Sequence, residues 1–229
     1  MNNQLSQPVS NKYLEIVASF FVGILIISNI ASSAKIVDAG ISLFSIPLIF
    51  DGGTILFPLV YVLGDVLTEV YGFKTARRVI WTGFAAMALT TLTFFTLGKM
   101  PAESYWEAET GSAAYESILG GMSYGGIVLA SLAAYLAGEF SNAAILSKIK
   151  TLMKGRLLWV RTIGSSLVGQ FLDTMIFVLI ATLTGVFGWE IFWSLVITNY
   201  IIKCAIEILI TPFTYWVTGF LKKGNCCQY

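Results

Sequence analysis

Six long apolar runs occupy most of this chain, and they decide what it can fold into. The runs cover roughly residues 14–33, 54–71, 79–97, 124–146, 161–187 and 190–221. An α-helix needs about 20 mostly apolar residues to cross the hydrocarbon core of a bilayer. Of the 229 residues, 56% are hydrophobic and 12% are charged, whereas a soluble domain is about a quarter charged. The sequence therefore predicts an all-α membrane protein with six transmembrane helices, in which residues 1–229 form one integral membrane domain.

Two features of these runs predict irregular structure. Segment 41–50 is apolar but too short to span a bilayer, and Pro47 and the Gly52-Gly53 pair break it. We therefore expect an interfacial or re-entrant piece here. The last two runs exceed the minimum length, which favours tilt or a kink. Pro212 is the expected kink in the sixth helix, because proline removes a helical hydrogen bond.

Lysine and arginine lie mostly on one side of this topology. That side carries Lys12, Lys74, Arg77, Arg78, Lys148, Lys150, Lys154, Arg156, Arg161, Lys222 and Lys223, whereas the other carries Lys35 and Lys99. Cytoplasmic loops are enriched in these residues. We therefore expect both termini in the cytoplasm of a multi-pass protein of the bacterial inner membrane.

The two halves of the chain share a short stretch of weak sequence similarity. The second helix contains Gly64-Asp65-Val66-Leu67-Thr68-Glu69, and the fifth contains Gly169-Gln170-Phe171-Leu172-Asp173-Thr174. Because three helices precede the second half, the two segments would cross the bilayer in opposite directions. This similarity is compatible with a 3+3 inverted repeat, an architecture common among transporters whose substrate site lies near the middle of the bilayer.

Six charged residues lie inside the predicted spans, away from the first two residues of each span. They are Asp65, Glu69, Glu139, Asp173, Lys203 and Glu207. Each costs about 2.5 to 3.5 kcal/mol at a helix centre even on the more lenient insertion scale. Helical spacing places them on defined faces with Tyr61, Tyr135, Asn142, Gln170, Phe177 and Asn199. The pattern favours a convergent, acid-rich cavity. The alternative is a set of buried structural pairs, in which Lys203 meets a carboxylate and Glu69 meets Arg77 or Arg78.

Catalytic, cofactor and metal functions find little support in the residues. Gly121-Met122-Ser123-Tyr124-Gly125 matches GxSxG, but the chain has no histidine to act as a base. It also has no phosphate-binding GxxxxGK[ST] loop. The three cysteines form neither a disulfide framework nor a metal motif. The net charge of +1 argues against a nucleic-acid partner. We expect no enzyme, no cofactor and no metal site.

Several motifs resemble those of the queuosine precursor transporters, a family formerly labelled vitamin uptake transporters. These motifs are Phe57-Pro58, 64–72, Ala76-Arg77-Arg78, 138–142, 158–161, Ser165-Ser166, Gly169-Gln170 and Asp173-Thr174, with Asn29, Lys35, Lys203 and Pro212. The resemblance covers roughly residues 14–221. It implies a secondary transporter that imports 7-deazaguanine bases or queuine.

The resemblance gives the polar residues candidate roles. A carboxylate can accept the N1–H and exocyclic amine of a guanine-like edge, amides can serve the carbonyl and ring nitrogens, and aromatic rings can stack on the base. Asp65 or Asp173 would hold the donor edge. The wider set of substrate-binding candidates is Asn29, Tyr61, Tyr135, Glu139, Asn142, Gln170, Phe177 and Lys203. Glu139 or Glu207 would meet the amine of an aminomethyl cargo or carry a coupling proton, and Glu69, Arg161 and Glu207 are candidates for coupling or gating.

Two other functions stay open at this point. The chain could be the substrate-binding membrane subunit of a vitamin-type importer that a separate ATPase module energises. Ser19 and Gly23 are its nearest approximation to the small residues, four apart, that such subunits use for docking. The chain could also be a membrane assembly protein without cargo. For the transporter we expect a small-molecule substrate and the lipid bilayer as partners, and a homodimer is plausible because six helices shield a cavity poorly.

Overall fold

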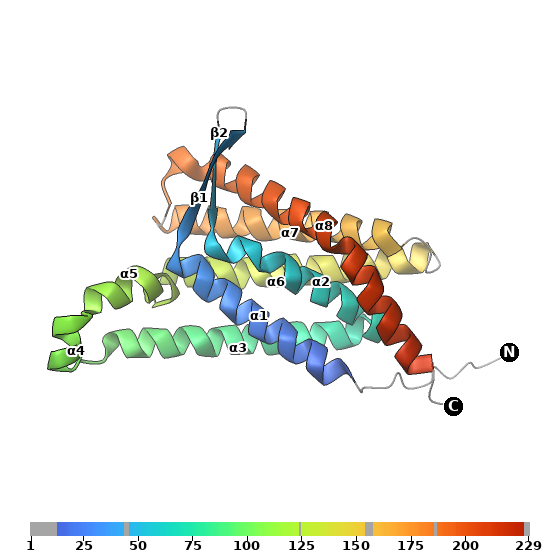
Figure 1. Ribbon diagram of the computed structural model, residues 1–229, viewed down its shortest axis with the longest axis horizontal. Helices are drawn as coiled ribbons and strands as arrows, with labels where there is room; N and C mark the ends of the chain where they lie inside the picture. The colour runs from blue at the N-terminus through green and yellow to red at the C-terminus, as the bar shows by residue number, and fades with distance from the viewer. Residues whose placement is uncertain (1–12, 44–45, 124, 154–157, 186, 227–229) are drawn as a thin grey trace.

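The computed structural model describes residues 13–43, 46–123, 125–153, 158–185 and 187–226. The elements, in chain order, are α1 (Leu14–Ala34), β1 (Ile36–Leu43), β2 (Ile46–Asp51), η2 (Gly52–Ile55), α2 (Phe57–Val66), η3 (Leu67–Tyr71), α3 (Phe73–Lys99), α4 (Ser104–Glu109), α5 (Ser112–Ser123), α6 (Gly125–Leu152), α7 (Leu158–Leu183), η4 (Trp189–Ile191) and α8 (Phe192–Cys226). Figure 1 shows the long helices running along the long axis, with the chain termini at one end and the β1–β2 hairpin toward the other.

Within the residues that the structure describes, six helices are long and apolar enough to cross a membrane, which confirms the predicted number. The spans are Leu14–Ala34, Gly52–Tyr71, Phe73–Lys99, Val128–Leu152, Leu158–Leu183 and Trp189–Leu221. The second span is assembled from η2, α2 and the single π-helical turn η3. Gly72, with φ of 85°, ends this span and allows the chain to reverse into α3.

Residues 41–43 and 46–50 belong to two antiparallel strands, so a β-hairpin occupies the place where an interfacial or re-entrant piece was predicted. Ile36 pairs with Asp51 and Leu43 pairs with Ile46, with an irregularity between Asp38 and Ser42. Gly40, with φ of 66°, lies inside this irregularity, where a bulge favours glycine. Figure 1 shows the hairpin projecting sideways from the helices, and β2 packs against α8. Pairing satisfies the backbone groups on the facing edges of the two strands, which a single short apolar segment in lipid cannot do.

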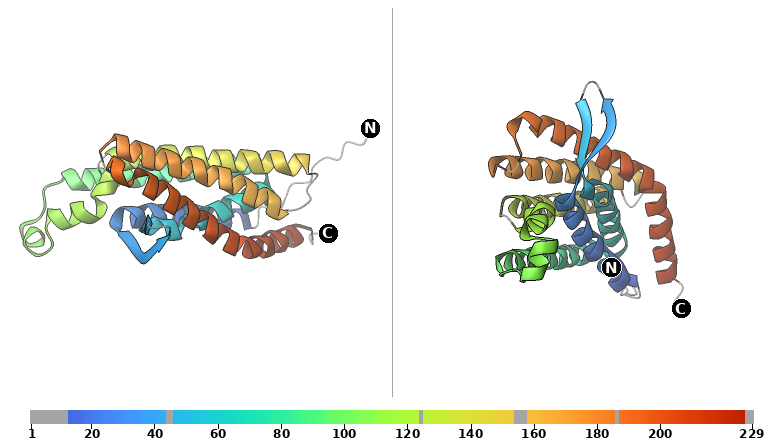
Figure 2. Two further views of the ribbon diagram at one scale, coloured as in Figure 1. Left: turned by 90° about the horizontal axis from the view of Figure 1, so that it is seen from above. Right: turned by 60° about the vertical axis from the view of Figure 1, so that its left-hand side comes forward.

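The second span lies at the centre of the bundle. Of its most apolar stretch, 67% is buried, against 22% to 44% in the other spans. It contacts α1, α6 and α8, and α8 in turn runs beside α7 (Figure 2). α6 and α7 pack closely along their length, because Gly138 and Gly169 face each other across the interface. The polar residues of the second span are therefore surrounded by protein on several sides.

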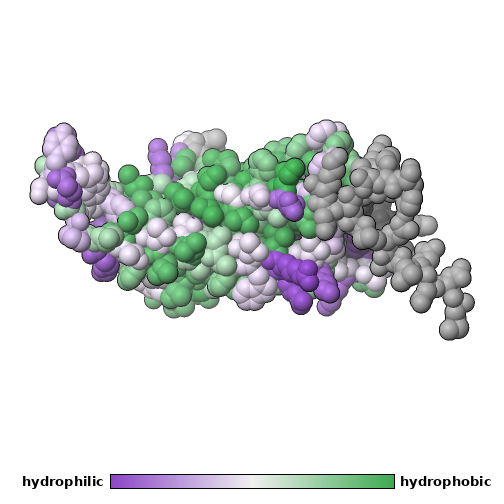
Figure 3. Space-filling model, turned by 90° about the horizontal axis from the view of Figure 1, so that it is seen from below, coloured by the Kyte–Doolittle hydropathy of each residue, from purple (hydrophilic) through white to green (hydrophobic). Residues whose placement is uncertain are grey.

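The outer surface is strongly apolar over the middle of the long axis. Figure 3 shows hydrophobic residues covering this region of one face, with hydrophilic residues gathered toward the ends. Exposed apolar side chains come from most of the spans and include Phe20, Trp81, Leu89, Leu129 and Leu209. Water disfavours such a continuous surface, and lipid tails accept it.

α8 is the longest helix and contains Pro212. It changes direction along its length in the right-hand view of Figure 2. A proline inside a helix is a common cause of such a bend. Its inward face carries Asn199, Lys203 and Glu207, all of them buried.

Candidate functional site

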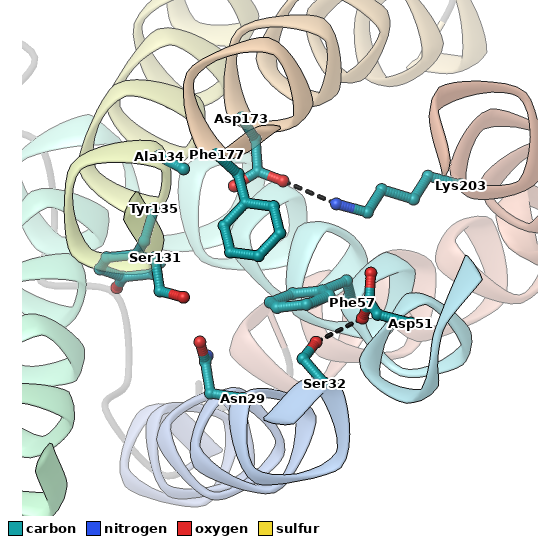
Figure 4. A pocket seen from close by; sticks show the side chains of 10 residues that line it. All are labelled: Asn29, Ser32, Asp51, Phe57, Ser131, Ala134, Tyr135, Asp173, Phe177 and Lys203. Atoms are coloured by element: carbon teal, nitrogen blue, oxygen red, sulfur yellow. Dashed lines mark hydrogen bonds and ion pairs between the residues drawn. The ribbon is translucent and has the colours of Figure 1, made fainter. Parts of the chain in front are cut away.

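A small cavity lies between the helices at the end of the bundle that carries the hairpin. Its walls come from the last turns of α1, the start of the second span, and the middle of α6, α7 and α8. The lining residues are Asn29, Ser32, Asp51, Phe57, Ser131, Ala134, Tyr135, Asp173, Phe177 and Lys203 (Figure 4). The cavity volume is about 20 Å³. In this conformation the cavity is narrow and has room for about one water molecule.

One wall of the cavity carries a buried ion pair. The Lys203 Nζ lies 2.8 Å from the Asp173 Oδ2, and the two residues are 5% and 8% exposed. The same Nζ lies 4.7 Å from the centre of the Phe57 ring, within cation–π range. α7, α8 and the start of α2 therefore meet at a single ammonium group. A ligand in the cavity would meet a carboxylate, a cation and an aromatic face together.

Asp51 holds the start of the second span in place. Its carboxylate accepts hydrogen bonds from the backbone N–H groups of Gly53 and Thr54, at 3.0 and 3.2 Å, and from the Thr54 hydroxyl at 2.9 Å. The Ser32 hydroxyl on α1 also donates to it. Asp51 is thus the N-cap of this span and its link to α1. These four bonds give Asp51 a structural role at the edge of the cavity.

The opposite wall offers neutral polar groups. The Asn29 amide nitrogen donates to the Leu25 carbonyl oxygen at 2.9 Å, which orients the amide on α1. Figure 4 shows the Asn29 amide and the Ser131 hydroxyl pointing toward one another across the cavity. The Tyr135 hydroxyl donates to the Ile80 carbonyl oxygen on α3 at 2.9 Å, so its ring forms a fixed wall. The rings of Phe57 and Phe177 lie on the side nearer Lys203 (Figure 4).

A second polar cluster lies further from the hairpin end. The Asn142 amide donates to the Asp65 Oδ1 at 2.8 Å, linking α6 to α2. The Gln170 amide donates to the Glu207 Oε2 at 2.5 Å, linking α7 to α8. The Ser166 hydroxyl lies 3.5 Å from the Asn142 Oδ1. Neutral amides thus satisfy one oxygen of each of these two carboxyl groups.

A third cluster lies toward the end of the bundle that carries the termini. The Arg161 guanidinium lies 3.3 Å from the Glu69 Oε1, and both side chains are 2% exposed. The Lys150 ammonium donates to the Glu69 carbonyl oxygen at 2.6 Å and lies 3.6 Å from the Glu69 Oε1. Glu69 belongs to η3, a π-helical turn of the kind that often marks functional positions in helices. Glu69 thus pairs with Arg161 and Lys150, whereas the structural alternative in the sequence analysis paired it with Arg77 or Arg78.

Glu139 and Tyr61 lie between these clusters, against glycines of the neighbouring helices. A Cβ built on Gly64 would lie 2.9 Å from the Glu139 Oε2, so the glycine makes room for the carboxyl group. A Cβ built on Gly138 would likewise meet the Tyr61 hydroxyl, so this glycine makes room for the tyrosine. Both residues are almost fully buried, at 2% exposure each.

The structure brings five of the predicted substrate-binding residues into the cavity and places the others elsewhere. Asn29, Tyr135, Asp173, Phe177 and Lys203 line it. The walls do not include Tyr61, Asp65, Glu69, Glu139, Asn142, Arg161, Gln170 or Glu207. The single convergent cavity expected from the sequence is therefore a series of three clusters along the bundle. Among the residues that the structure describes, no group of three or more His, Cys, Asp or Glu could hold a metal ion.

Sequence reasoning missed Ser32, Asp51, Phe57, Ser131 and Ala134. Asp51 precedes the second apolar run, so a search for charges inside the spans passes over it. Its position immediately before Gly52-Gly53-Thr54 is a recognisable N-cap signal. Serine, alanine and phenylalanine are common in membrane spans, and nothing in the sequence separates those that line a cavity from those that pack.

Six apolar spans around a buried polar cavity define a multi-pass membrane protein of the transporter class. Residues 51–217 match the model of a family described as "Putative vitamin uptake transporter". A protein of Bacillus subtilis named "Probable queuosine precursor transporter" is 32% identical over 71% of this chain and 69% of its own. The "Queuosine precursor transporter" of Escherichia coli is 23% identical over 84% of this chain and 82% of its own. A Haemophilus influenzae protein named "Probable queuosine precursor transporter" is 23% identical over 72% of this chain and 66% of its own.

The chain belongs to this family of membrane transporters, as the family match and the Bacillus subtilis relative together show. The six spans and the bacterial relatives make it a multi-pass protein of the inner membrane. No solved structure matches it.

Proposed function

We propose that this protein is a secondary transporter that imports queuosine precursors, either 7-deazaguanine bases or queuine, across the inner membrane. The names of the three bacterial relatives support this cargo class. The observation that carries the proposal is the buried cavity in which Asp173, Lys203, Asn29 and two phenylalanine rings converge.

The chemistry of the cavity suits a guanine-like base. The N1–H and exocyclic amine of such a base need an acceptor, and the Asp173 carboxylate lies in the wall. The carbonyl oxygen and ring nitrogens need donors, which Lys203 and the Asn29 amide supply. The Phe57 and Phe177 rings provide apolar faces on which a flat base can stack, worth about 1 to 3 kcal/mol per stacked base in nucleic-acid complexes.

Import requires the bundle to open, because the cavity is too narrow for a two-ring base in this conformation. If both termini lie in the cytoplasm, as the distribution of lysine and arginine predicts, the cavity lies in the outer half of the membrane. The Glu69–Arg161 pair then lies in the inner half and holds η3 against α7. Cargo would enter from outside and leave once the inner cluster separates, which is alternating access around a fixed site.

The decisive experiment is uptake in bacterial cells that cannot synthesise queuosine. Each precursor is supplied at limiting concentration, and queuosine in tRNA is measured. The wild-type protein should restore the modification with at least one precursor. Asp173→Asn and Lys203→Met should each lower the initial uptake rate at least about tenfold, because each leaves its buried partner unpaired. Glu109→Gln, on the exposed surface of α4, should leave uptake unchanged.

Failure of the wild-type protein to restore modification with every precursor, despite its presence in the membrane, would contradict the proposed cargo. Normal uptake by both cavity variants would contradict the proposed site.

The ATPase-energised subunit makes a different prediction. α1 has an exposed face on which Ser19 is exposed and a Cβ on Gly23 would meet nothing within 4 Å. Such a face could take a docking helix. Purified protein alone in liposomes should exchange labelled for unlabelled precursor if it is a transporter, whereas a subunit would need its ATPase module for any flux.

A further inference from the structure

Glu139 differs from every other buried carboxyl group in the bundle. Asp173 and Glu69 each lie beside a cation, while Asp65 and Glu207 each accept a hydrogen bond from an amide. Neither oxygen of Glu139 has a hydrogen-bond partner among the residues that the structure describes, although the residue is 2% exposed. An ionised carboxylate in such a site would lose its hydration without compensation. A neutral carboxylic acid loses less on such burial than a carboxylate does.

The balance of buried charge leads to the same conclusion. In the described part of the chain, five carboxyl residues are buried, namely Asp65, Glu69, Glu139, Asp173 and Glu207. Two cationic residues, Arg161 and Lys203, are buried with them. Lys150 reaches Glu69 from a partly exposed position. The carboxyl groups outnumber the cations, and among the described residues Glu139 is the buried one with neither a cation nor an amide beside it.

The groups that face Glu139 offer it no cation. Tyr61 and Asp65 approach from α2, Asp173 from α7 and Glu207 from α8, with Tyr135 one turn away on α6. Lys203 is engaged with Asp173. The neighbours are thus acidic or phenolic, and none of them is a cation that could pair with a Glu139 carboxylate.

Glu139 also lies on a path between the clusters. Tyr135, Glu139 and Asn142 follow one face of α6 at helical spacing. Tyr135 lines the cavity and Asn142 binds Asp65 in the second cluster. The unpartnered hydroxyl of Tyr61 lies in the same layer. A proton at Glu139 is one helical turn from the cavity on one side and from the second cluster on the other.

We propose that Glu139 binds one proton in each transport cycle and thereby couples cargo import to proton entry. The inference rests on the proposed function. The carboxylate takes a proton from hydronium in water that reaches it through the outer cavity, and the proposal assigns the resulting neutral acid to the closed bundle, where the structure shows the carboxyl group without a partner. When the inner half opens, the O–H bond breaks and the proton passes to cytoplasmic water, while the carboxylate oxygens gain solvent. The cargo moves in the same direction and no covalent bond to it changes.

The test separates net transport from exchange in liposomes that contain the purified protein alone. The probe is tritiated 7-cyano-7-deazaguanine, with the aminomethyl compound and queuine tested in parallel. With acid outside, the wild-type protein should accumulate the probe, by up to about tenfold per pH unit for one proton per cargo. A protonophore should abolish the accumulation. Exchange of labelled for unlabelled probe at equal pH needs no net proton movement and should proceed without a gradient.

Glu139→Gln mimics the neutral acid and cannot release a proton. It should keep exchange within about twofold of the wild-type rate and lose gradient-driven accumulation at least about tenfold. Glu139→Asp, which retains an acid, should recover part of the accumulation, and Glu109→Gln on α4 should behave as the wild type.

Each other outcome overturns a specific claim. Accumulation by Glu139→Gln at the wild-type level would remove Glu139 from coupling. Wild-type exchange without any response to the pH gradient would exclude proton coupling while leaving the cargo assignment intact. Loss of exchange in Glu139→Gln would make Glu139 a cargo-binding or structural residue and overturn the proposal. Absence of exchange by the wild type for all three compounds would contradict the proposed function itself.

Discussion

Two glycines on facing helices show how single residues shape this bundle. A Cβ on Gly138 would lie 2.8 Å from the Asp173 Cβ and 3.1 Å from the Gly169 carbonyl oxygen, and would also meet the Tyr61 hydroxyl. A Cβ on Gly169 would lie 2.8 Å from the Asn142 Cβ. Small residues let membrane helices approach closely, and close approach here brings the polar side chains of α2, α6 and α7 together. The missing side chains are a condition for the polar clusters.

Gly138→Ala should therefore destabilise the protein. Its methyl group meets backbone and Cβ atoms, which cannot move without shifting a helix, so we expect a loss of about 1 to 3 kcal/mol in the free energy of unfolding. Gly164→Ala is the matched control on α7, because its Cβ would meet only the Ile149 Cδ1 at 3.8 Å. Thermal unfolding in detergent measures both variants. Equal midpoints for the two would show that α6 and α7 are not packed as closely as described.

At the scale of elements, the second span depends on its capped start. Asp51 accepts four hydrogen bonds that join the hairpin, η2 and α1. The hydroxyl oxygen of Thr54, in η2, also lies 3.2 Å from the Asn199 Oδ1 on α8. The first turn of this span is thereby fixed between α1 and α8, and Phe57 is positioned beside Lys203.

Substitutions of Asp51 should separate the effect of its N-cap hydrogen bonds from the effect of its negative charge. Asp51→Ala removes the acceptor and should cost about 1 to 2 kcal/mol of stability, whereas Asn is a comparable N-cap and Asp51→Asn should retain most of it. Chemical unfolding in mixed micelles measures the difference. If the two variants lose the same stability, the negative charge rather than the cap holds this region.

The sequence predicts some elements well and others poorly, for physical reasons. The six spans follow from length and apolarity alone, because the bilayer imposes both. The hairpin was not predicted, since Phe44-Ser45 between its strands lacks the Asn, Asp or Gly typical of short hairpin turns. The candidate site was predicted in part. Charges inside spans, such as Asp173 and Lys203, are conspicuous because they are costly, whereas Ser131 and Phe57 acquire a role only when tertiary packing brings them to the cavity. The proposed 3+3 repeat remains a prediction, although Gly64 and Gly169 of the two motifs both pack against α6.

At the scale of the whole molecule, polar contacts at two levels hold the bundle together. Near the hairpin, the Lys203–Asp173 pair joins α8 to α7. Near the termini, the Arg161–Glu69 pair joins α7 to the end of the second span. α7 takes part in both pairs. Moving α8 away from α7 must therefore break the Lys203–Asp173 pair or pivot about it, and moving η3 away from α7 must do the same at the Arg161–Glu69 pair.

A double-mutant cycle on Arg161 and Glu69 tests the pair near the termini. Arg161→Met alone removes the buried guanidinium beside the Glu69 carboxylate, and should cost about 3 to 5 kcal/mol of stability. Arg161→Met combined with Glu69→Leu removes both charges and should recover much of this loss. Thermal unfolding gives the coupling energy. Additive losses in the double variant would mean that the two side chains act independently.

The depth at which the second span is buried also has a consequence for synthesis. Asp65 finds its amide partner 77 residues later in the chain, and Glu69 finds its arginine 92 residues later. At about 5 to 20 residues per second, the ribosome delivers these partners roughly 4 to 18 s after the carboxyl groups themselves. During that interval the second span carries two acidic side chains without α6 or α7 beside it. We therefore expect the second span to reach its final packing only when the chain is nearly complete, later than the more lipid-exposed α1 and α3.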